Sequence, residues 1–315
     1  MNEAGEVAFM APLTGPSVVD ENSQALYADT FGGLSLVART GTAATALGFG
    51  VSYDQIVEHD LSDTGQTLFS ARLRGLPVDD TNDSGIFLRG DGPAELVIRE
   101  GDPAPGLGPG VVFGGLVPGN IPTPALDIND SGKIAFRTML RGDGVDNSTN
   151  GAIYATNDQG DLDLILRDGD QVPGLADGVV FSQSDLGGGI VLNDRGDLLI
   201  LAQFEGPGIV EENDAAIFYL GADSGYDPQI VVRQGDLLDV DNSPLAEDLR
   251  VVEFFDLSLE QFRSSFSDHG QITFQASFTD SSQGVFLATV PEPSAAILAV
   301  LLAIGCATTA RRLGL

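Results

Sequence analysis

The chain is poor in the residue types on which most catalytic and metal sites depend. Its 315 residues include one cysteine, two histidines and no tryptophan. The single cysteine, Cys306, excludes an intramolecular disulfide framework and any cysteine-based metal site. His59 and His269 leave little for a zinc site or a catalytic triad. We expect both to be structural or solvated; the alternative for His59, beside Asp60, is a proton-transfer pair.

Positive charge is also scarce. The chain has 46 acidic and 15 basic residues, with Lys133 as the only lysine, and its formal net charge is −31. Such a surface repels a polyanion, so we expect no nucleic-acid partner. The acidity is typical of a protein that stays soluble in an extracellular or saline setting. The sharper alternative is divalent-cation binding by some of the Asp-rich loops.

Long helical patterns are scarce before the C-terminus, whereas glycine (40 residues) and proline (16 residues) are abundant. Short apolar runs between turn residues predict an all-β fold with many short strands. A hydrophobic content of 43% fits a globular protein, and the length allows one large domain or two ordinary ones.

One turn-strand unit recurs along the chain, and its clearest copy is residues 129–136 (NDSGKIAF). A short polar side chain opens the turn by bonding the backbone two residues on, and glycine closes it at a position that needs positive φ. The apolar residues behind it then enter a strand. Five copies close with the glycines Gly5, Gly65, Gly132, Gly196 and Gly270. The period of about 65 residues suits four short strands with their loops.

The same series of strands follows each turn. A second strand comes after a polar loop, a third ends in Arg-x-Gly-Asp, and a fourth apolar run closes the unit. Four antiparallel strands per repeat predict a β-propeller; a β-sandwich or another tandem β-array is the alternative. We expect the full units to cover about 34–89, 95–156, 163–220 and 229–288, with a partial first unit over 1–29.

Two patterns are candidates for ligand binding. Asp127, Asn129 and Ser131 partly resemble a calcium loop, although no acidic residue stands at its twelfth position. We favour a self-bonded polar turn and expect no metal or other cofactor, with calcium as the alternative. The Arg-x-Gly-Asp copies could line a ligand-binding mouth. Their repetition favours a structural role in which the glycine makes a turn and the arginine stem packs on the sheet edge.

The composition changes abruptly after a β-repeat domain that we place at 1–289. The tail, 290–315, begins with Pro291, Glu292 and Pro293, continues with an uncharged apolar run, and ends near Arg311 and Arg312. The run predicts a transmembrane helix at about 294–310, slightly short of the ~20 residues usual for a span. The arginines would lie on the cytoplasmic side, with the repeat domain outside.

These three parts, in this order, resemble the PEP-CTERM protein-sorting tail. The repeat resembles the tandem NxxGxxAF repeat of some surface proteins; the copies at 2–9 and 129–136 match it in full. The resemblance implies recognition by an exosortase in the membrane, cleavage near Pro291, Glu292 and Pro293, and delivery to the cell surface or the exopolysaccharide matrix. It supplies no catalytic residues for the repeat domain.

An exported protein needs a signal peptide, and none is recognisable at Met1, which is followed at once by a repeat turn. We therefore expect the natural start to lie upstream. The leading hypothesis is a non-catalytic scaffold or adhesion module of the cell surface or extracellular matrix, anchored transiently in the membrane. The alternative is an exported hydrolase or carbohydrate-binding propeller with its site at the central mouth.

Overall fold

The computed structural model describes residues 1–116, 126–182, 189–240, 248–256, 265–290 and 311–312. The elements assigned in these residues are β-strands and three short 3-10 helices, η1 (Asp20–Asn22), η2 (Thr45–Leu47) and η4 (Ala222–Ser224). All paired strands are antiparallel, so the prediction of an all-β chain is confirmed. The chain forms two compact units, Met1–Arg167 and Asp168–Leu315.

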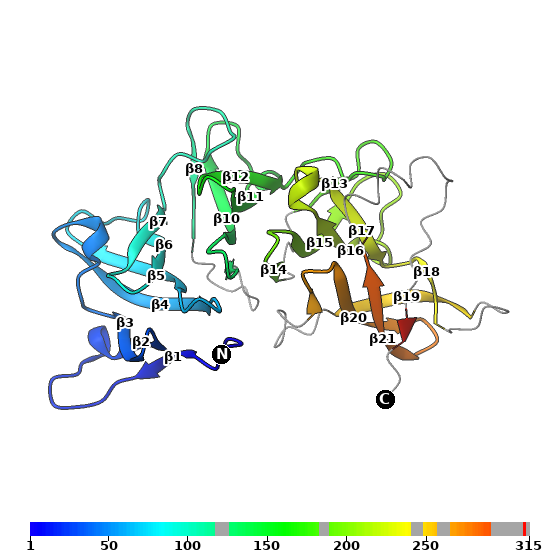
Figure 1. The fold of residues 1–315 in the computed structure, drawn as a ribbon. Helices are drawn as coiled ribbons and strands as arrows, with labels where there is room; N and C mark the ends of the chain where they lie inside the picture. Colours follow the sequence, from blue (N-terminus) through cyan, green and yellow to red (C-terminus); the bar gives the residue numbers. More distant parts are fainter. Residues whose placement is uncertain (117–125, 183–188, 241–247, 257–264, 291–310, 313–315) are drawn as a thin grey trace. The chain divides into compact units, whose positions relative to one another are not determined.

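The first unit contains three sheets (Figure 1). The first sheet consists of β1 (Val7–Pro12), β2 (Gln24–Thr30) and β3 (Gly33–Arg39). The second consists of β4 (Val51–Leu61), β5 (Thr67–Gly75), β6 (Ser84–Arg89) and β7 (Glu95–Arg99). In the third, β8 (Val111–Phe113) and β9 (Leu126–Ile128) both pair with β10 (Ile134–Gly142), which is followed by β11 (Gly151–Thr156) and β12 (Leu162–Arg167).

The second unit contains two sheets of the same kind. In the fourth sheet, β13 (Val180–Phe181) and β14 (Ile190–Leu192) pair with β15 (Leu198–Glu205), followed by β16 (Ala215–Leu220) and β17 (Pro228–Arg233). The fifth sheet contains β18 (Leu237–Asp239), β19 (Leu249–Asp256), β20 (Gln271–Phe278), β21 (Gln283–Thr289) and β22 (Arg311–Arg312). The two short strands β8 and β9 of the third sheet therefore correspond to the single long strand β4 of the second sheet. In the fourth sheet, β13 and β14 correspond to it in the same way.

The predicted unit boundaries are wrong by one strand. The sequence placed each Arg-x-Gly-Asp strand at the start of a unit, but it pairs with the strand before it: β3 with β2, β7 with β6, β12 with β11 and β17 with β16. Strands joined by a short connection form a hairpin, and this preference decides the pairing. The fourth apolar run accordingly opens the next sheet.

The sheets share a packing rule. In all sheets but the fourth, where Ile200 faces Phe218, an aromatic pair lies directly across two neighbouring strands, with rings stacked at 5.3 Å for Phe69 and Phe87 and at 5.9 Å for Phe136 and Tyr154. In the second and third sheets the register with the outer strand shifts beside this pair, at Phe87 between β6 and β7 and at Tyr154 between β11 and β12, which marks a β-bulge. The aromatic face packs on the aliphatic face of the preceding sheet, where Leu68, Ile86 and Ile98 lie under Phe136 and Tyr154 in one core.

Most of the predicted tail lies outside the described residues, including Pro291, Glu292, Pro293 and the helix expected at about 294–310. Arg311 and Arg312 form β22 and pair with β21. Within the described part of the chain, none of the helices has the length and apolar character needed to cross a bilayer.

Candidate functional site

The repeated turn is built from its first side chain. In the copy at 129–132, Oδ1 of Asn129 accepts hydrogen bonds from the Ser131 hydroxyl (2.8 Å) and the Lys133 amide (2.9 Å), and the Gly132 amide donates to the Asn129 carbonyl (3.0 Å). The Lys133 carbonyl accepts from the Asn129 amide (3.0 Å), which starts the strand pairing. The φ of Gly132 is +80°, as the sequence predicted for the closing glycine. The glycines of the other copies also have positive φ: Gly5, Gly65, Gly196 and Gly270.

Successive turns are joined by a carboxylate of the second residue. The Glu3 amide donates to Oδ1 of Asp63 at 2.7 Å, and the Asp63 amide donates to Oδ1 of Asp130 at 2.7 Å. In the second unit the Asp194 amide donates to Oδ1 of Asp268 at 2.8 Å. Equivalent turns, 60 to 74 residues apart in sequence, therefore lie next to one another within each unit. We call this series of bonds the turn ladder.

The calcium candidates belong to this hydrogen-bonded frame. Asp127 and Asn129 are buried, and Oδ1 of Asp127 accepts the Ile128 amide at 2.8 Å. Oδ1 of Asn129 carries the two bonds described above, one of them from Ser131. Over the described residues, no three His, Cys, Asp or Glu side chains are grouped so that they could hold a metal ion.

The Arg-x-Gly-Asp loops repeat another set of bonds. Nε of each arginine donates to a backbone carbonyl of the loop before the second strand: Arg99 to Asn82, Arg167 to Thr149 and Arg233 to Asn213, at 2.7–3.1 Å. Arg39, in the related sequence Arg-Thr-Gly-Thr, makes the same bond to Asn22 at 3.0 Å. The glycine amide then donates to the first strand of the next sheet, as from Gly101 to the Phe113 carbonyl at 2.9 Å. The loops thus use their arginines and glycines to hold neighbouring segments together, in agreement with the structural interpretation.

The two histidines belong to different units. Nε2 of His59 is 3.3 Å from the Ala8 carbonyl, so this ring links β4 to β1, and burial lowers its pKa. His269 occupies the third position of the last turn, which holds Ser131 and Arg195 in other copies. In the fourth turn Arg195 forms an ion pair with the buried Asp197 at 2.5 Å, an interaction that sequence reasoning missed.

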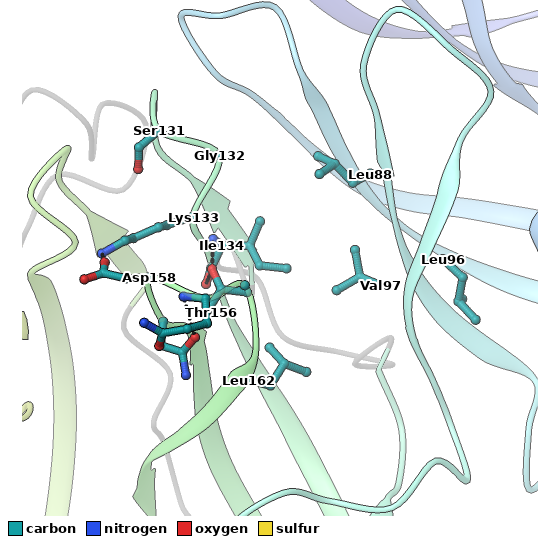
Figure 2. Close-up of a pocket in the computed structure, with 13 residues that line it drawn as sticks. Leu88, Leu96, Val97, Ser131, Gly132, Lys133, Ile134, Thr156, Asp158 and Leu162 are labelled. Carbon is teal, nitrogen blue, oxygen red and sulfur yellow. Dashed lines mark hydrogen bonds and ion pairs between the residues drawn. The ribbon is translucent and has the colours of Figure 1, made fainter.

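The first unit also contains a groove that is not part of the repeated hydrogen-bond pattern (Figure 2). It measures about 670 Å³ and lies between the second and third sheets. Its apolar walls come from the strands β6, β7, β10 and β12: Leu88, Leu96, Val97, Ile134 and Leu162. Polar groups of the turns at 129–132 and 157–160 complete the lining.

The only lysine stands in this groove. Nζ of Lys133 contacts Oδ1 of Asp158 at 2.6 Å, and this bond lowers the pKa of Asp158. Asp158 is well exposed, so the pair contributes little to stability. It lies in a turn, residues 157–160 (NDQG), that has the pattern of the repeated turn but joins β11 to β12. That pattern is the signal by which sequence reasoning could have found the groove.

Comparisons with known proteins give a family and a distant similarity to solved structures. A family model described as "Family of unknown function (DUF7453)" matches residues 1–173 and again 128–297. The two matches begin as far apart as Gly5 and Gly132, which close the first and third turns. No curated protein matches the chain. A solved GH43 β-1,3-galactosidase with galactodeoxynojirimycin is similar over 92% of this chain and 89% of its own, at 12% identity and a TM-score of 0.33.

Proposed function

The chain belongs to the DUF7453 family, whose function is unknown, and we propose from its geometry that it is a non-catalytic β-repeat scaffold. The observation that carries the proposal is that the same residue types make the same bonds in successive repeats. A single active site needs one copy of its residues, whereas a repeated frame needs its residues in every copy. The turn ladder and the arginine bonds of the Arg-x-Gly-Asp loops both have this character.

In the proposed architecture each sheet is one blade of a β-propeller. Sheets of three to five strands in a largely sequential antiparallel order, together with equivalent turns joined side by side, support it. The aliphatic face of each sheet packs on the aromatic face of the next in two cores of the first unit and in one of the second.

The proposed setting is the cell surface or exopolysaccharide matrix, reached through the sorting tail and an exosortase. The support is the order of Pro291, Glu292, Pro293, the apolar run, Arg311 and Arg312 in the sequence. Fractionation of the native host with and without its exosortase tests this. We expect surface or matrix protein in the first strain and accumulation in the membrane in the second. A protein that stays cytosolic in both would contradict the proposal.

The second candidate function is binding of a carbohydrate, or its hydrolysis, by an exported propeller. The groove with Lys133 and Asp158 favours a binding site of some kind, because these residues are not repeated in the other sheets. Among its described lining residues there is no aromatic ring on which a sugar could stack. Calorimetry of the chain with matrix oligosaccharides, compared between the natural protein and Lys133→Ala, discriminates the two functions.

A further inference from the structure

Three asparagines of the chain lie in the pattern Asn-x-Ser or Asn-x-Thr, which is the acceptor pattern for N-linked glycans in surface loops of exported proteins. They are Asn82, Asn129 and Asn147. All three belong to the first unit and lie in a loop or turn outside the strands. Their side chains differ in burial and in the hydrogen bonds that they make, so the structure can separate them.

Two of these asparagines belong to the repeated frame. Asn129 is 3% exposed, and its Oδ1 carries the two bonds of the turn described above. Asn82 is half-buried, and its Oδ1 accepts the Asp79 amide at 3.1 Å and the Arg99 guanidinium at 2.9 Å. Because these bonds fix both side chains within the fold, neither amide is presented for modification.

Asn147 differs from both, because it is exposed in the loop between β10 and β11. Within the described part of the chain, its side chain makes no hydrogen bond. Ser148 is exposed and Thr149 is half-buried, so the whole pattern lies at the surface. Their hydroxyls bond to Asp146 in this exposed loop, where such bonds open locally at little cost. A modifying enzyme can therefore reach the asparagine and the hydroxyl of the third residue.

The loop before β11 departs from its repeats at two positions. In the loops before β2, β6 and β16, the residue whose carbonyl accepts the arginine Nε is an asparagine. Its Oδ1 accepts the amide three residues earlier at 2.9–3.1 Å, in Asn22, Asn82 and Asn213. In the loop before β11 this residue is Thr149, whose hydroxyl accepts the Asp146 amide at 3.0 Å instead.

The second departure lies two positions earlier in the loop. Asp20, Asp80 and Glu211 hold this place in the other three loops, and all three are exposed. The loop before β11 has Asn147 there, so a neutral amide replaces a carboxylate in a chain with 46 acidic residues. All four loops make the arginine bond, so the repeated frame does not explain either change. Together the two changes convert an acid-x-Asn sequence into Asn-x-Thr.

We infer that Asn147 is an N-glycosylation site and accepts an oligosaccharide that is activated as the diphosphate of a polyprenyl lipid. In the transfer, Nδ2 of Asn147 forms a bond to the anomeric carbon of the sugar. The bond from that carbon to the diphosphate oxygen breaks, the lipid diphosphate leaves with the electron pair, and the amide nitrogen gives up one proton to solvent. The site rests on the proposed function, because such transfer takes place outside the cytoplasm.

The test is the mass of tryptic peptides from the full chain, purified from its native host. Cleavage after arginine and lysine places Asn82, Asn129 and Asn147 in three different peptides, 75–89, 100–133 and 142–167. We expect the peptide 142–167 to carry the extra mass of an oligosaccharide, which fragmentation locates on Asn147. The other two peptides should have the masses of their sequences.

Four variants produced in the same host test whether the pattern directs the modification. Asn147→Gln and Thr149→Ala should abolish the extra mass, whereas Thr149→Ser keeps a hydroxyl and should retain it. Ser148→Ala is the matched control, because it removes a hydroxyl bond of 2.7 Å to the same Asp146 but leaves the pattern intact. The extra mass should persist in this variant.

An unmodified peptide 142–167 would overturn the inference. Extra mass that persists in Asn147→Gln would also overturn it, since the glycan would then lie on a hydroxyl or on another asparagine. The cell fraction from which the chain is recovered tests the proposed function separately. A chain found at the surface without a glycan leaves the scaffold standing, whereas a cytosolic chain without a glycan contradicts both.

Discussion

The backbone amide of Asp63 donates a hydrogen bond of 2.7 Å to Oδ1 of Asp130, a residue 67 positions later in the chain. The two residues hold the same place in consecutive turns. The bond is therefore a direct link between repeats, made by the loops rather than by the packed faces of the sheets. Because a carboxylate accepts it, it belongs to the stronger class of hydrogen bonds.

Removing this carboxylate should destabilise the first unit. Asp130→Ala leaves the partly buried Asp63 amide without its acceptor, which costs about 1–3 kcal/mol in the free energy of unfolding. Asp130→Asn keeps a carbonyl acceptor and should cost less. Urea denaturation of the three proteins measures the differences. Asp158→Ala is the matched control, since Asp158 has the same place in a similar turn but contacts Lys133 instead of another turn; an equal loss there would contradict the ladder.

A second prediction concerns a glycine at which two strands cross closely. Gly142, at the end of β10, has φ of +122°, and a Cβ atom there would lie 1.9 Å from the Gly110 carbonyl oxygen. Gly75 and Gly206 make the same approach to Gly50 and Gly178. Gly142→Ala should therefore cost more than about 2 kcal/mol through strain and displacement of the strand. Thermal or urea denaturation measures it, with Gly90→Ala as the control, because nothing lies within 4 Å of a Cβ there.

The third prediction concerns the repeated arginine bonds. Nε of Arg233 donates to the Asn213 carbonyl at 3.1 Å, and its guanidinium lies 5.1 Å from the centre of the Phe204 ring. Arg233→Lys keeps the charge but loses the planar fork, so we expect a loss of about 1 kcal/mol in the free energy of unfolding. Arg89→Lys, where the contact is a single bond to the Ser35 hydroxyl, is the comparison and should change stability less. Equal losses of stability at both sites would show that the planar guanidinium of Arg233 does not account for the effect.

The sequence predicted the repeated turns and the strands that follow them, but not the contacts that join one repeat to the next. The turn from Asn129 to Gly132 and the strand behind it follow from local chemistry, because a short polar side chain and a residue with free φ act within five positions. The bond from Asp63 to Asp130 could not be predicted, since it depends on which turns become neighbours in space. The sheet boundaries failed for a related reason: apolar strands such as β3 fit either neighbouring sheet by composition, and only the hairpin connection decides.

The groove, likewise, could be predicted from the sequence only in part. Lys133 is conspicuous in the sequence as the only lysine. Its position in the repeat does not predict its ion pair with Asp158, because Asp158 lies in the turn of a different hairpin. Phe9 and Phe69 have the same pattern around them, and their different exposure depends on which faces are covered.

The last prediction is a pH dependence carried by Glu100. Its buried carboxylate accepts the Ser84 hydroxyl at 2.9 Å and forms an ion pair with Arg141 at 3.1 Å. Burial, together with the nearby Asp83, raises the pKa of Glu100 above its usual value of 4.5. The folded chain then binds this proton more tightly than the unfolded chain. The contribution of Glu100 to stability is therefore fully present below pH 4.5 and is lost as the pH rises to the folded-state pKa.

Glu100→Gln removes this titration. The variant should lack the part of the pH dependence that Glu100 supplies, so the difference in the free energy of unfolding between natural chain and variant should favour the natural chain most at low pH and shrink as the pH rises above 4.5. Urea denaturation of both proteins at a series of pH values from 4 to 7, roughly spanning the usual range of carboxyl titration, measures that difference. A difference that stays constant, or that grows with pH, would mean that the Arg141 ion pair outweighs burial at this site.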